Sequence, residues 1–565
     1  NAAMPERSIV QWDKDDLDAM GLLKIDILAL GMLSALKRAL DLAEQRQTHE
    51  LAMQSARTPP PRPFTMQNIP RHDKATFDMI SCADTIGVFQ IESRAQMSML
   101  PRIKPQQFYD LVIQVAIVRP GPIQGGMVHP YLRRRQGLEQ TDYPNPKIEK
   151  ILSRTLGIPI FQEQAMQIAM VAAGFSADEA DLLRRSMAAW RRKGGIEKFR
   201  IRLIGGMVSH GYSEPFAEAI FRQLEGFGEY GFPESHAASF AQLAYISAWL
   251  KRHEPEAFLA ALLNSQPMGF YAPSQLVQDA QRHGVMVLPV DIAASQWEAT
   301  LVMNHPTFPG PGQANTKNTE AAKTNAAIPR PAVRLGLNLI KGLSQEAGHR
   351  IEAARQNHSF HDTHDLALRA ELGRAEMEAL AGANSLLSLS GHRRIARWHA
   401  ANVPLKGLLR EAPIMDTSQP DLPAPTERQN IVADYQSIRL TLGRHPLKLL
   451  RPALLSQRFV TAAALSKDYP DRRLARACGI VTTRQRPQTA NGIIFVSLED
   501  ETGIVNVIIR PELAQRQRHE LLQARLLGVY GIWQRQHNVC HLMASRLVDL
   551  SYLLPELATY SRNFH

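Results

Sequence analysis

Hydrophobic residues recur at helical spacing through most of the first 300 residues. Between 161 and 173 they form an amphipathic pattern that stops at Gly174, a residue suited to the left-handed conformation after a helix end. Ser176 and Glu179 then form a capping box for the next helix, and Ser235 is expected to cap a further one. The core face of the helix after Ser176 is predicted to carry Leu182, Leu183 and Met187. The pattern predicts a mainly helical body.

The periodicity changes near the C-terminus. Three β-branched runs, Gly492–Leu498, Gly503–Ile509 and Leu527–Trp533, are separated by turn-forming or polar segments. Short strands of this kind within about 80 basic residues predict a small β-barrel.

Proline-rich and low-complexity segments divide the chain. Residues 53–64 contain three consecutive prolines, and residues 303–332 are rich in Pro, Asn, Ala and Gly with few large apolar residues. We expect the second segment to be a disordered linker. Residues 401–470 include another proline-rich stretch and give no clear structural prediction.

Composition limits the class of protein. The 565 residues are 44% hydrophobic and 21% charged, which is typical of folded domains, and no apolar run approaches the roughly 18–20 residues of a membrane span. The three cysteines, Cys82, Cys478 and Cys540, are too far apart for a disulfide framework or a CxxC zinc site. This favours a reducing compartment. The chain opens without an initiator Met and reads as one entered in the middle.

Positive charge is concentrated in two regions of a chain whose formal charge is +11. Residues 91–202 hold 18 Lys and Arg against 10 Asp and Glu, and residues 471–550 hold 11 against 7. Such regions favour a polyanionic partner, because each neutralised phosphate releases a counterion. The alternative is a solvated basic surface without a ligand.

The segment 22–28 predicts a buried strand in which Lys24 and Asp26 share one face. Charged groups in such a strand must be paired or ligand-bound, because an unpaired buried charge is very costly. A structural Lys–Asp pair is one interpretation. The functional one is that Asp26 ligates a divalent metal while Lys24 meets an anionic substrate group.

Further candidates lie on the helices of the body. Arg184 and Arg185 diverge by about 100° around their helix, so they could hold different oxygens of one polyphosphate. His236 lies at the first turn of its helix, where backbone N–H groups favour anions. A solvated face and a structural histidine are the competing interpretations.

Taken together, these motifs resemble a bacterial family C DNA polymerase, the family of the polymerase III alpha subunit. The resemblance rests on GLLKID at 21–26, VFQIESR at 88–94, RPGP at 119–122, LLRRSM at 182–187 and YGF at 230–232 with Ser235 and His236 after it. Downstream, IKGLS at 340–344 resembles a helix-hairpin-helix, with Ser344 in place of the usual second glycine, and FVSLED at 495–500 resembles the family's OB-fold.

The resemblance implies a multidomain, mainly α fold: fingers and a helix-hairpin-helix, with a residual palm strand and a C-terminal OB-fold β-barrel. It implies a fragment without the PHP domain and most of the palm, inactive on its own. The implied domains are 1–31 palm, 32–302 fingers, 303–332 linker, 333–400 helix-hairpin-helix, 401–470 unassigned, 471–550 OB-fold and 551–565 tail.

The resemblance also implies residue roles in a DNA-directed DNA polymerase. Asp26 would be the third catalytic carboxylate and help hold two Mg²⁺ ions, while Lys24, Arg184 and Arg185 would neutralise the incoming dNTP. His236 would lie beside the nucleotide and the primer end. Single-stranded DNA would bind the barrel through four basic and aromatic residues, Arg484, Arg486, Phe495 and Trp533.

Two departures point to the error-prone, damage-inducible branch used in translesion synthesis. The chain stops soon after the barrel, and Glu234 replaces a basic residue common in the replicative branch. Partners implied are primer–template DNA, dNTPs, a sliding clamp and a Y-family-like accessory protein, in the bacterial cytoplasm at the nucleoid and without a membrane. The alternatives are a non-catalytic DNA-binding protein and a truncated replicative alpha subunit.

Overall fold

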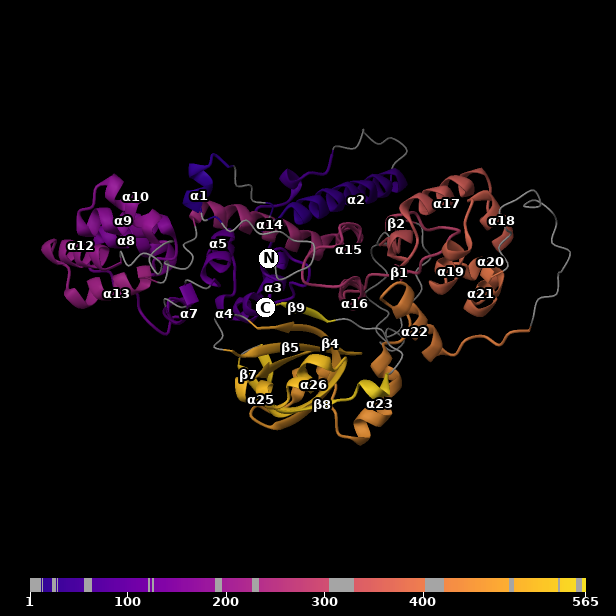
Figure 1. Cartoon of the computed structure of the whole chain (residues 1–565). Helices are drawn as coiled ribbons and strands as arrows, with labels where there is room; N and C mark the ends of the chain where they lie inside the picture. The colour runs from indigo at the N-terminus through magenta and orange to yellow at the C-terminus, as the bar shows by residue number, and fades with distance from the viewer. Residues whose placement is uncertain are drawn as a thin grey trace.

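The computed structural model describes residues 12, 14–22, 27, 29–54, 63–119, 122–123, 126–187, 196–225, 233–303, 330–401, 421–486, 492–536, 539–554 and 561–564. A long helical body, a smaller helical region and a C-terminal barrel succeed one another along the chain (Figure 1). The predicted fold class, mainly helical with a C-terminal OB-fold barrel, is confirmed. Among the described residues, no helix combines the length and the apolar character that crossing a bilayer requires.

The body is built around two central helix pairs, α14 against α5 and α15 against α2. Eight consecutive residues of α5 are buried, from Asp110 to Ile117, so this helix lies inside the body. The elements of the body are α1 (Lys14–Ala19), α2 (Leu30–Gln54), η1 (Met66–Asn68), α3 (Lys74–Ser81), α4 (Arg94–Ile103), α5 (Phe108–Ile117), α7 (Val128–Arg135), α8 (Pro146–Leu152), η2 (Ser153–Thr155), α9 (Gln162–Ala173), α10 (Ala177–Met187), α12 (Ile196–Ser209), α13 (Glu214–Glu225), α14 (Glu234–His253), α15 (Pro255–Asn264) and α16 (Pro273–Arg282).

Local sequence signals placed several of these helices correctly. Gly174 ends α9 with a φ of 67°, and Ser176 and Glu179 form the predicted capping box before α10, with N···O distances of 2.8 and 3.1 Å. On α10, Leu183 is buried but Leu182 is 58% exposed, so the predicted core face is only partly right.

The expected cap of α14 is wrong. This helix begins at Glu234, one residue before Ser235, and Pro233 is its N-cap. The Glu234 N–H donates to the Glu163 carboxylate, 3.0 Å away, so a side chain from α9 takes the place of a local serine cap.

A small sheet connects the body to the helix-hairpin-helix region. Its strands are β1 (Val287–Leu288), β2 (Thr300–Val302) and β3 (Ala332–Arg334), in the order β1-β3-β2, with β3 parallel to β1 and antiparallel to β2. Residues 304–329, most of the predicted linker, lie outside the described residues. The region continues with η4 (Leu337–Leu339), α17 (Gln345–Asn357), α18 (Thr363–Arg369), α19 (Arg374–Gly382), α20 (Leu387–Ser390) and α21 (Arg393–Ala401).

The described part of the unassigned segment 401–470 packs against the barrel. Its helices are α22 (Glu427–Ser437), α23 (Pro446–Ser456) and α24 (Ala462–Asp468). Leu447 and Leu454 share a buried cluster with Leu526 of the barrel. Arg451, 8% exposed, donates to both oxygens of Glu501 at 2.6 and 2.7 Å. A buried ion pair therefore ties α23 to the turn between two strands.

Five strands close the barrel in the order β4-β5-β6-β8-β7, because β5 pairs with β4 as well as with β6. Trp533 lies in its core and is 1% exposed. A sixth strand near the C-terminus adds to β4 in parallel. The elements are β4 (Leu474–Gln485), β5 (Ile494–Asp500), β6 (Gly503–Ile509), α25 (Pro511–Arg516), α26 (Arg518–Gln523), β7 (Leu526–Gln536), β8 (Val539–Asp549), η6 (Ser551–Leu553) and β9 (Arg562–Phe564).

Candidate nucleic-acid interface

A groove of about 550 Å³ separates the barrel from helix α4 of the body. Figure 1 shows α4 on the side of the body that faces the barrel, and Arg94 of α4 contacts Ser497 of β5. The barrel side of the groove is formed by β5, β6, the end of β4 and the start of β8. OB-folds bind oligonucleotides on the face of their second and third strands, which are β5 and β6 here. The groove therefore lies on the face that this fold commonly uses.

The described charged residues that line the groove are all positive. Arg94 of α4 and Arg486 at the end of β4 both line it, and the described residues around it include no Asp or Glu. Arg94 donates from Nε and Nη2 to Ser497 Oγ, at 3.1 and 2.7 Å, which joins α4 to β5. Two cations without a neighbouring carboxylate favour an anionic ligand such as a phosphodiester backbone.

Aromatic and polar groups complete the groove. Phe270 of the body and Phe495 of β5 line it, as do Asn506 and His541. Asn506 Oδ1 and His541 Nδ1 are buried and have no hydrogen-bond partner among the described residues. Burial, followed by the nearby charges of Arg102 and Arg94, lowers the pKa of His541 to about 4. The groove thus offers ring faces and unused polar atoms beside positive charge.

Two of the four residues predicted to bind DNA at the barrel line this groove, namely Arg486 and Phe495. The other two do not. Trp533 is in the barrel core, and Arg484 is 8% exposed, with its guanidinium donating to the carbonyl oxygens of Leu521 and Ala524, each at 2.6 Å. This burial argues against the prediction that Trp533 and Arg484 contact DNA.

The C-terminal segment explains the burial of Arg484. Arg484 Nη1 also donates to Ser561 Oγ, and β9 pairs with β4 from Thr483 to Gln485. Residues far apart along the chain thus cover a side chain that the resemblance to an OB-fold marks as a DNA contact. No local pattern around Arg484 signals this return of the chain.

The predicted triphosphate residues of the body are described only in part. Arg184 is half-exposed on α10 and donates to Asp181 Oδ1 from Nε and Nη2, at 2.9 and 2.8 Å. Lys24, Asp26 and the side chain of Arg185 lie outside the described residues. Helix α10 lies at the far end of the body from the barrel (Figure 1), so Arg184 belongs to a different surface from the groove.

The predicted buried strand at 22–28 lies mostly outside the described residues as well. The two described positions in it, Leu22 and Ile27, are 46% and 70% exposed. Their exposure differs from the expected burial of an apolar strand.

His236 lies in the first turn of α14, as predicted, with its ring centroid 4.2 Å from that of Phe240. The same turn is fixed by Glu234, which accepts a hydrogen bond from the Tyr109 hydroxyl at 2.7 Å and forms an ion pair with Arg154 at 2.9 Å. Burial, followed by the bond to Glu234, raises the pKa of Tyr109. Sequence reasoning singled out Glu234 but missed Arg154, which is distant in the chain.

Two of the motif segments contact each other. Arg119 of the 119–122 segment donates to Gln90 Oε1 of the 88–94 segment at 2.9 Å. Arg119 Nε also donates to the Val115 carbonyl oxygen at 3.2 Å, and Gln90 has a φ of 63°. The two segments are therefore in contact at the C-terminal end of α5.

The predicted hairpin at 340–344 connects η4 to α17. Ser344 caps α17 by accepting from the Ala347 N–H at 3.1 Å, and Gly342 has a φ of 90°. The Lys341 N–H donates to the Ser437 carbonyl oxygen at 2.8 Å. Ser344 thus has a capping role, and one hairpin N–H that could hold a DNA phosphate is already used by α22.

Three parts of the chain match models of known protein families. Residues 32–211 match the finger domain of the bacterial DNA polymerase III alpha subunit, residues 284–396 a helix-hairpin-helix motif, and residues 475–550 an OB-fold nucleic acid binding domain.

Relatives resemble the chain along its whole length. It is 63% identical over 571 residues to a protein of Bordetella bronchiseptica, 58% over 573 residues to one of Burkholderia pseudomallei and 53% over 566 residues to one of Methylococcus capsulatus. Each of these is called an error-prone DNA polymerase, and each match covers 100% of this chain and 51%, 51% and 52% of the relative. The chain spans about half the length of the curated relatives it matches.

Proposed function

The chain belongs to the bacterial family C DNA polymerases, which include the polymerase III alpha subunit and the error-prone polymerases, and on this basis we propose that it is the fingers, helix-hairpin-helix and OB-fold portion of an error-prone DNA polymerase. The complete enzyme would add dNMPs to a primer 3′-hydroxyl on damaged templates. It would act in the bacterial cytoplasm, with a sliding clamp and a Y-family-like accessory protein as partners.

The groove between α4 and the barrel is the observation that supports DNA as the partner. In the proposal, the template strand passes along β5 and β6. Arg486 and Arg94 would lie near its phosphates, and a base would stack on Phe495. The residues around the groove suit this, because a backbone needs positive charge and every base has a ring face.

In this proposal, nucleotidyl transfer would depend on Asp26 and on residues of the body. Carboxylate oxygen is the ligand that Mg²⁺ prefers, so Asp26 suits the proposed role, but one carboxylate cannot hold two ions. The other ligands would come from the rest of the enzyme, since the relatives are about twice as long. When bound, the ions would lower the pKa of the primer hydroxyl and offset charge on the pyrophosphate.

Positive side chains of this chain would support the same reaction. The primer oxygen would attack the α-phosphorus of the dNTP as the bond to pyrophosphate breaks. Lys24, Arg184 and Arg185 would neutralise the triphosphate, and His236 would lie beside the nucleotide. Two hydrogen bonds to Asp181 Oδ1, from the preceding turn of α10, orient that guanidinium.

The substitution Asp26→Ala in the full-length enzyme tests this proposal. We expect primer extension to be lost, while binding of primer–template DNA stays within about twofold, because the carboxylate would contact metal and not DNA. Asp16→Ala removes an acid of α1, which precedes Asp26 in the sequence, and should leave extension unchanged. Extension that survives Asp26→Ala would show that Asp26 is not a catalytic ligand.

A non-catalytic DNA-binding protein is the second candidate, and the same groove supports it. It predicts salt-dependent DNA binding without nucleotide incorporation, even by the full-length natural product. Primer extension by the unaltered full-length protein would exclude this candidate before any substitution is made.

A further inference from the structure

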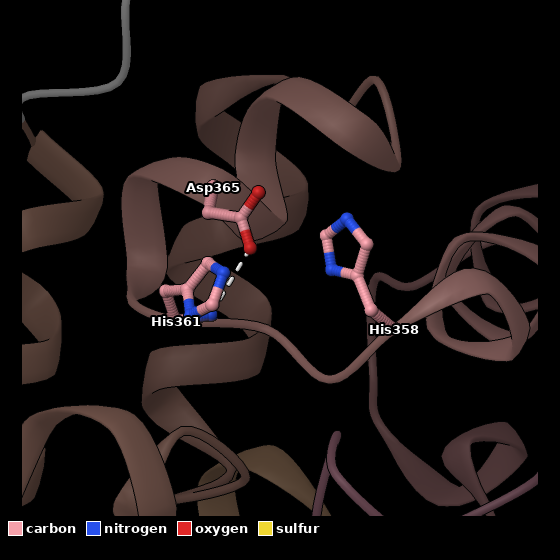
Figure 2. Close-up of side chains that lie close together, drawn as sticks. All are labelled: His358, His361 and Asp365. Atoms are coloured by element: carbon pink, nitrogen blue, oxygen red, sulfur yellow. Dashed lines mark hydrogen bonds between the residues drawn. The ribbon is translucent and has the colours of Figure 1, made fainter.

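Three potential metal ligands meet at the junction of α17 and α18, away from the barrel groove. His358 directly follows α17, His361 lies in the connection, and Asp365 is in the first turn of α18 (Figure 2). One ligand atom from each lies within 4.8 Å of the others. The two imidazoles are exposed to solvent, so an ion could enter without unfolding the region.

Phe360 and Arg369 anchor the connection between α17 and α18 that carries the two histidines. Phe360, between them in sequence, is 8% exposed and packs into the core of the body and helix-hairpin-helix region. The Arg369 guanidinium lies 4.8 Å from the Phe360 ring centroid and donates to the carbonyl oxygens of His358 and Ser359, at 2.8 and 3.3 Å. Because Phe360 and the carbonyls turn inward, the side chains of His358 and His361 are left on the outside.

Hydrogen bonds also fix the position of Asp365. Asp362 caps α18 by accepting from the Asp365 N–H at 2.8 Å, which fixes the first turn. Asp365 Oδ2 accepts from the His361 N–H at 3.0 Å and from Arg369 at 3.1 Å, whereas Oδ1 has no hydrogen-bond partner among the described residues. These hydrogen bonds hold the carboxylate in place and leave Oδ1 available to an incoming ion.

We propose that His358, His361 and Asp365 bind a divalent transition-metal ion of the Zn²⁺, Co²⁺ or Ni²⁺ class. Two imidazole nitrogens and one carboxylate oxygen suit such borderline ions, whereas Mg²⁺ and Ca²⁺ prefer oxygen ligands alone. His358 Nδ1 lies 3.0 Å from the Ser359 carbonyl oxygen, which orients the ring. A water molecule would complete a four-coordinate site.

A second cluster of possible ligands, Asp84, Asp279 and His283, provides an internal contrast. There the Lys251 ammonium lies 3.0 Å from Asp84 Oδ1 and 2.7 Å from Asp279 Oδ2. The lysine already provides the positive charge between those carboxylates, so a metal ion has no place there. At the α17–α18 junction, Arg369 instead contacts one carboxylate oxygen, Asp365 Oδ2, and its other hydrogen bonds to described residues go to main-chain carbonyls.

The ion would act as a clamp between the end of α17 and the start of α18. Both helices belong to the helix-hairpin-helix region, in which α17 starts at the hairpin capped by Ser344. Metal binding would therefore stabilise this region independently of nucleotide chemistry.

Titration of the metal-free 565-residue chain with ZnCl₂ or CoCl₂ tests the proposal, by calorimetry and by the visible absorption of bound Co²⁺. We expect one site per chain, with intense tetrahedral Co²⁺ bands. His361→Ala and Asp365→Asn should each weaken binding by more than the roughly 10–100-fold that outer-shell changes cost. His361 is exposed and Asp365 is partly buried, and circular dichroism will confirm that both variants fold.

Two matched controls locate the ion. His349→Ala removes another exposed histidine of α17, and His283→Ala alters the cluster around Lys251; neither should change the affinity. Binding that survives the double variant His358→Ala/His361→Ala, or that is lost in His283→Ala, would overturn the proposal. So would the absence of any Zn²⁺ or Co²⁺ binding below millimolar concentrations. None of these readouts depends on polymerase activity.

Discussion

The two sides of the barrel carry the same kinds of residue under opposite conditions. On the groove side, Arg486 is exposed and Phe495 lines a cavity whose described walls have no acidic residue. The closed side comprises the barrel core and the positions beneath α26, where Trp533 and Arg484 are 1% and 8% exposed, respectively. Arg484 and Arg486 are only two residues apart, yet one binds main-chain carbonyls and the other faces solvent.

The difference shows that a basic or aromatic residue in an OB-fold acquires its role from what covers it. Helix α26 and the C-terminal segment cover Arg484, while α4 leaves an open groove over Phe495. The closed side should therefore contribute to folding and the groove side to binding. Paired substitutions can separate these two contributions.

The largest expected effect comes from the aromatic pair. Trp533→Ala should lower the free energy of unfolding of the barrel by about 3–5 kcal/mol, because it leaves a cavity in the core. Phe495→Ala should change stability much less and weaken binding of single-stranded DNA by about 1–3 kcal/mol, the cost of one lost stacking platform. Urea unfolding and fluorescence anisotropy with a labelled oligonucleotide measure the two. Equal destabilisation by both substitutions would contradict the comparison.

The arginine pair should follow the same division with smaller effects. Arg484→Met should lower the free energy of unfolding by about 2–3 kcal/mol, because the carbonyls of Leu521 and Ala524 lose a charged donor. Arg486→Ala should leave stability nearly unchanged and reduce the slope of log affinity against log salt by about 0.7 for single-stranded DNA. An unchanged slope for Arg486→Ala would remove this residue from the proposed interface.

The smallest expected effect is a pH dependence on the groove side. Because the pKa of His541 is lowered to about 4, against about 6.5 in an unfolded chain, the folded state keeps this imidazole neutral. The neutral imidazole therefore contributes fully to the free energy of unfolding above about pH 6.5. This contribution is lost as the pH falls toward 4, and the total loss is about 1–3 kcal/mol. Unfolding measured between pH 7 and 4.5 should show this loss in the natural chain and a flatter profile in His541→Gln. Parallel profiles would assign the dependence to other groups.

Much of the local structure followed from short sequence patterns. Gly174 ends α9 and the capping box at Ser176 starts α10 because these signals act within one helical turn. The strand runs correspond to β5, β6 and β7, because alternating β-branched residues suit a pleated surface. The cap of α14 was predicted wrongly because its partner, Glu163, comes from another helix.

The same limit applies to the candidate sites. Arg486 and Phe495 were identified from residue type, but nothing local indicated that α4 would form the opposite wall with Arg94. Likewise, His358, His361 and Asp365 are close in sequence, whereas the inward anchor at Phe360 and Arg369 depends on the packing of the whole region.

The sequence by itself determined the helical body, the barrel strands, the basic regions and the resemblance to a polymerase family, because these depend on neighbouring residues and on motifs within single segments. Only the tertiary structure decided which side chains are accessible. Arg484 became a buried hydrogen-bond donor because α26 and residue 561 pack over it, and Arg94 became a wall of the groove because α4 packs beside β5. Exposure here depends on contacts between residues 37, 77 and 403 positions apart, and no periodicity within one segment carries that information.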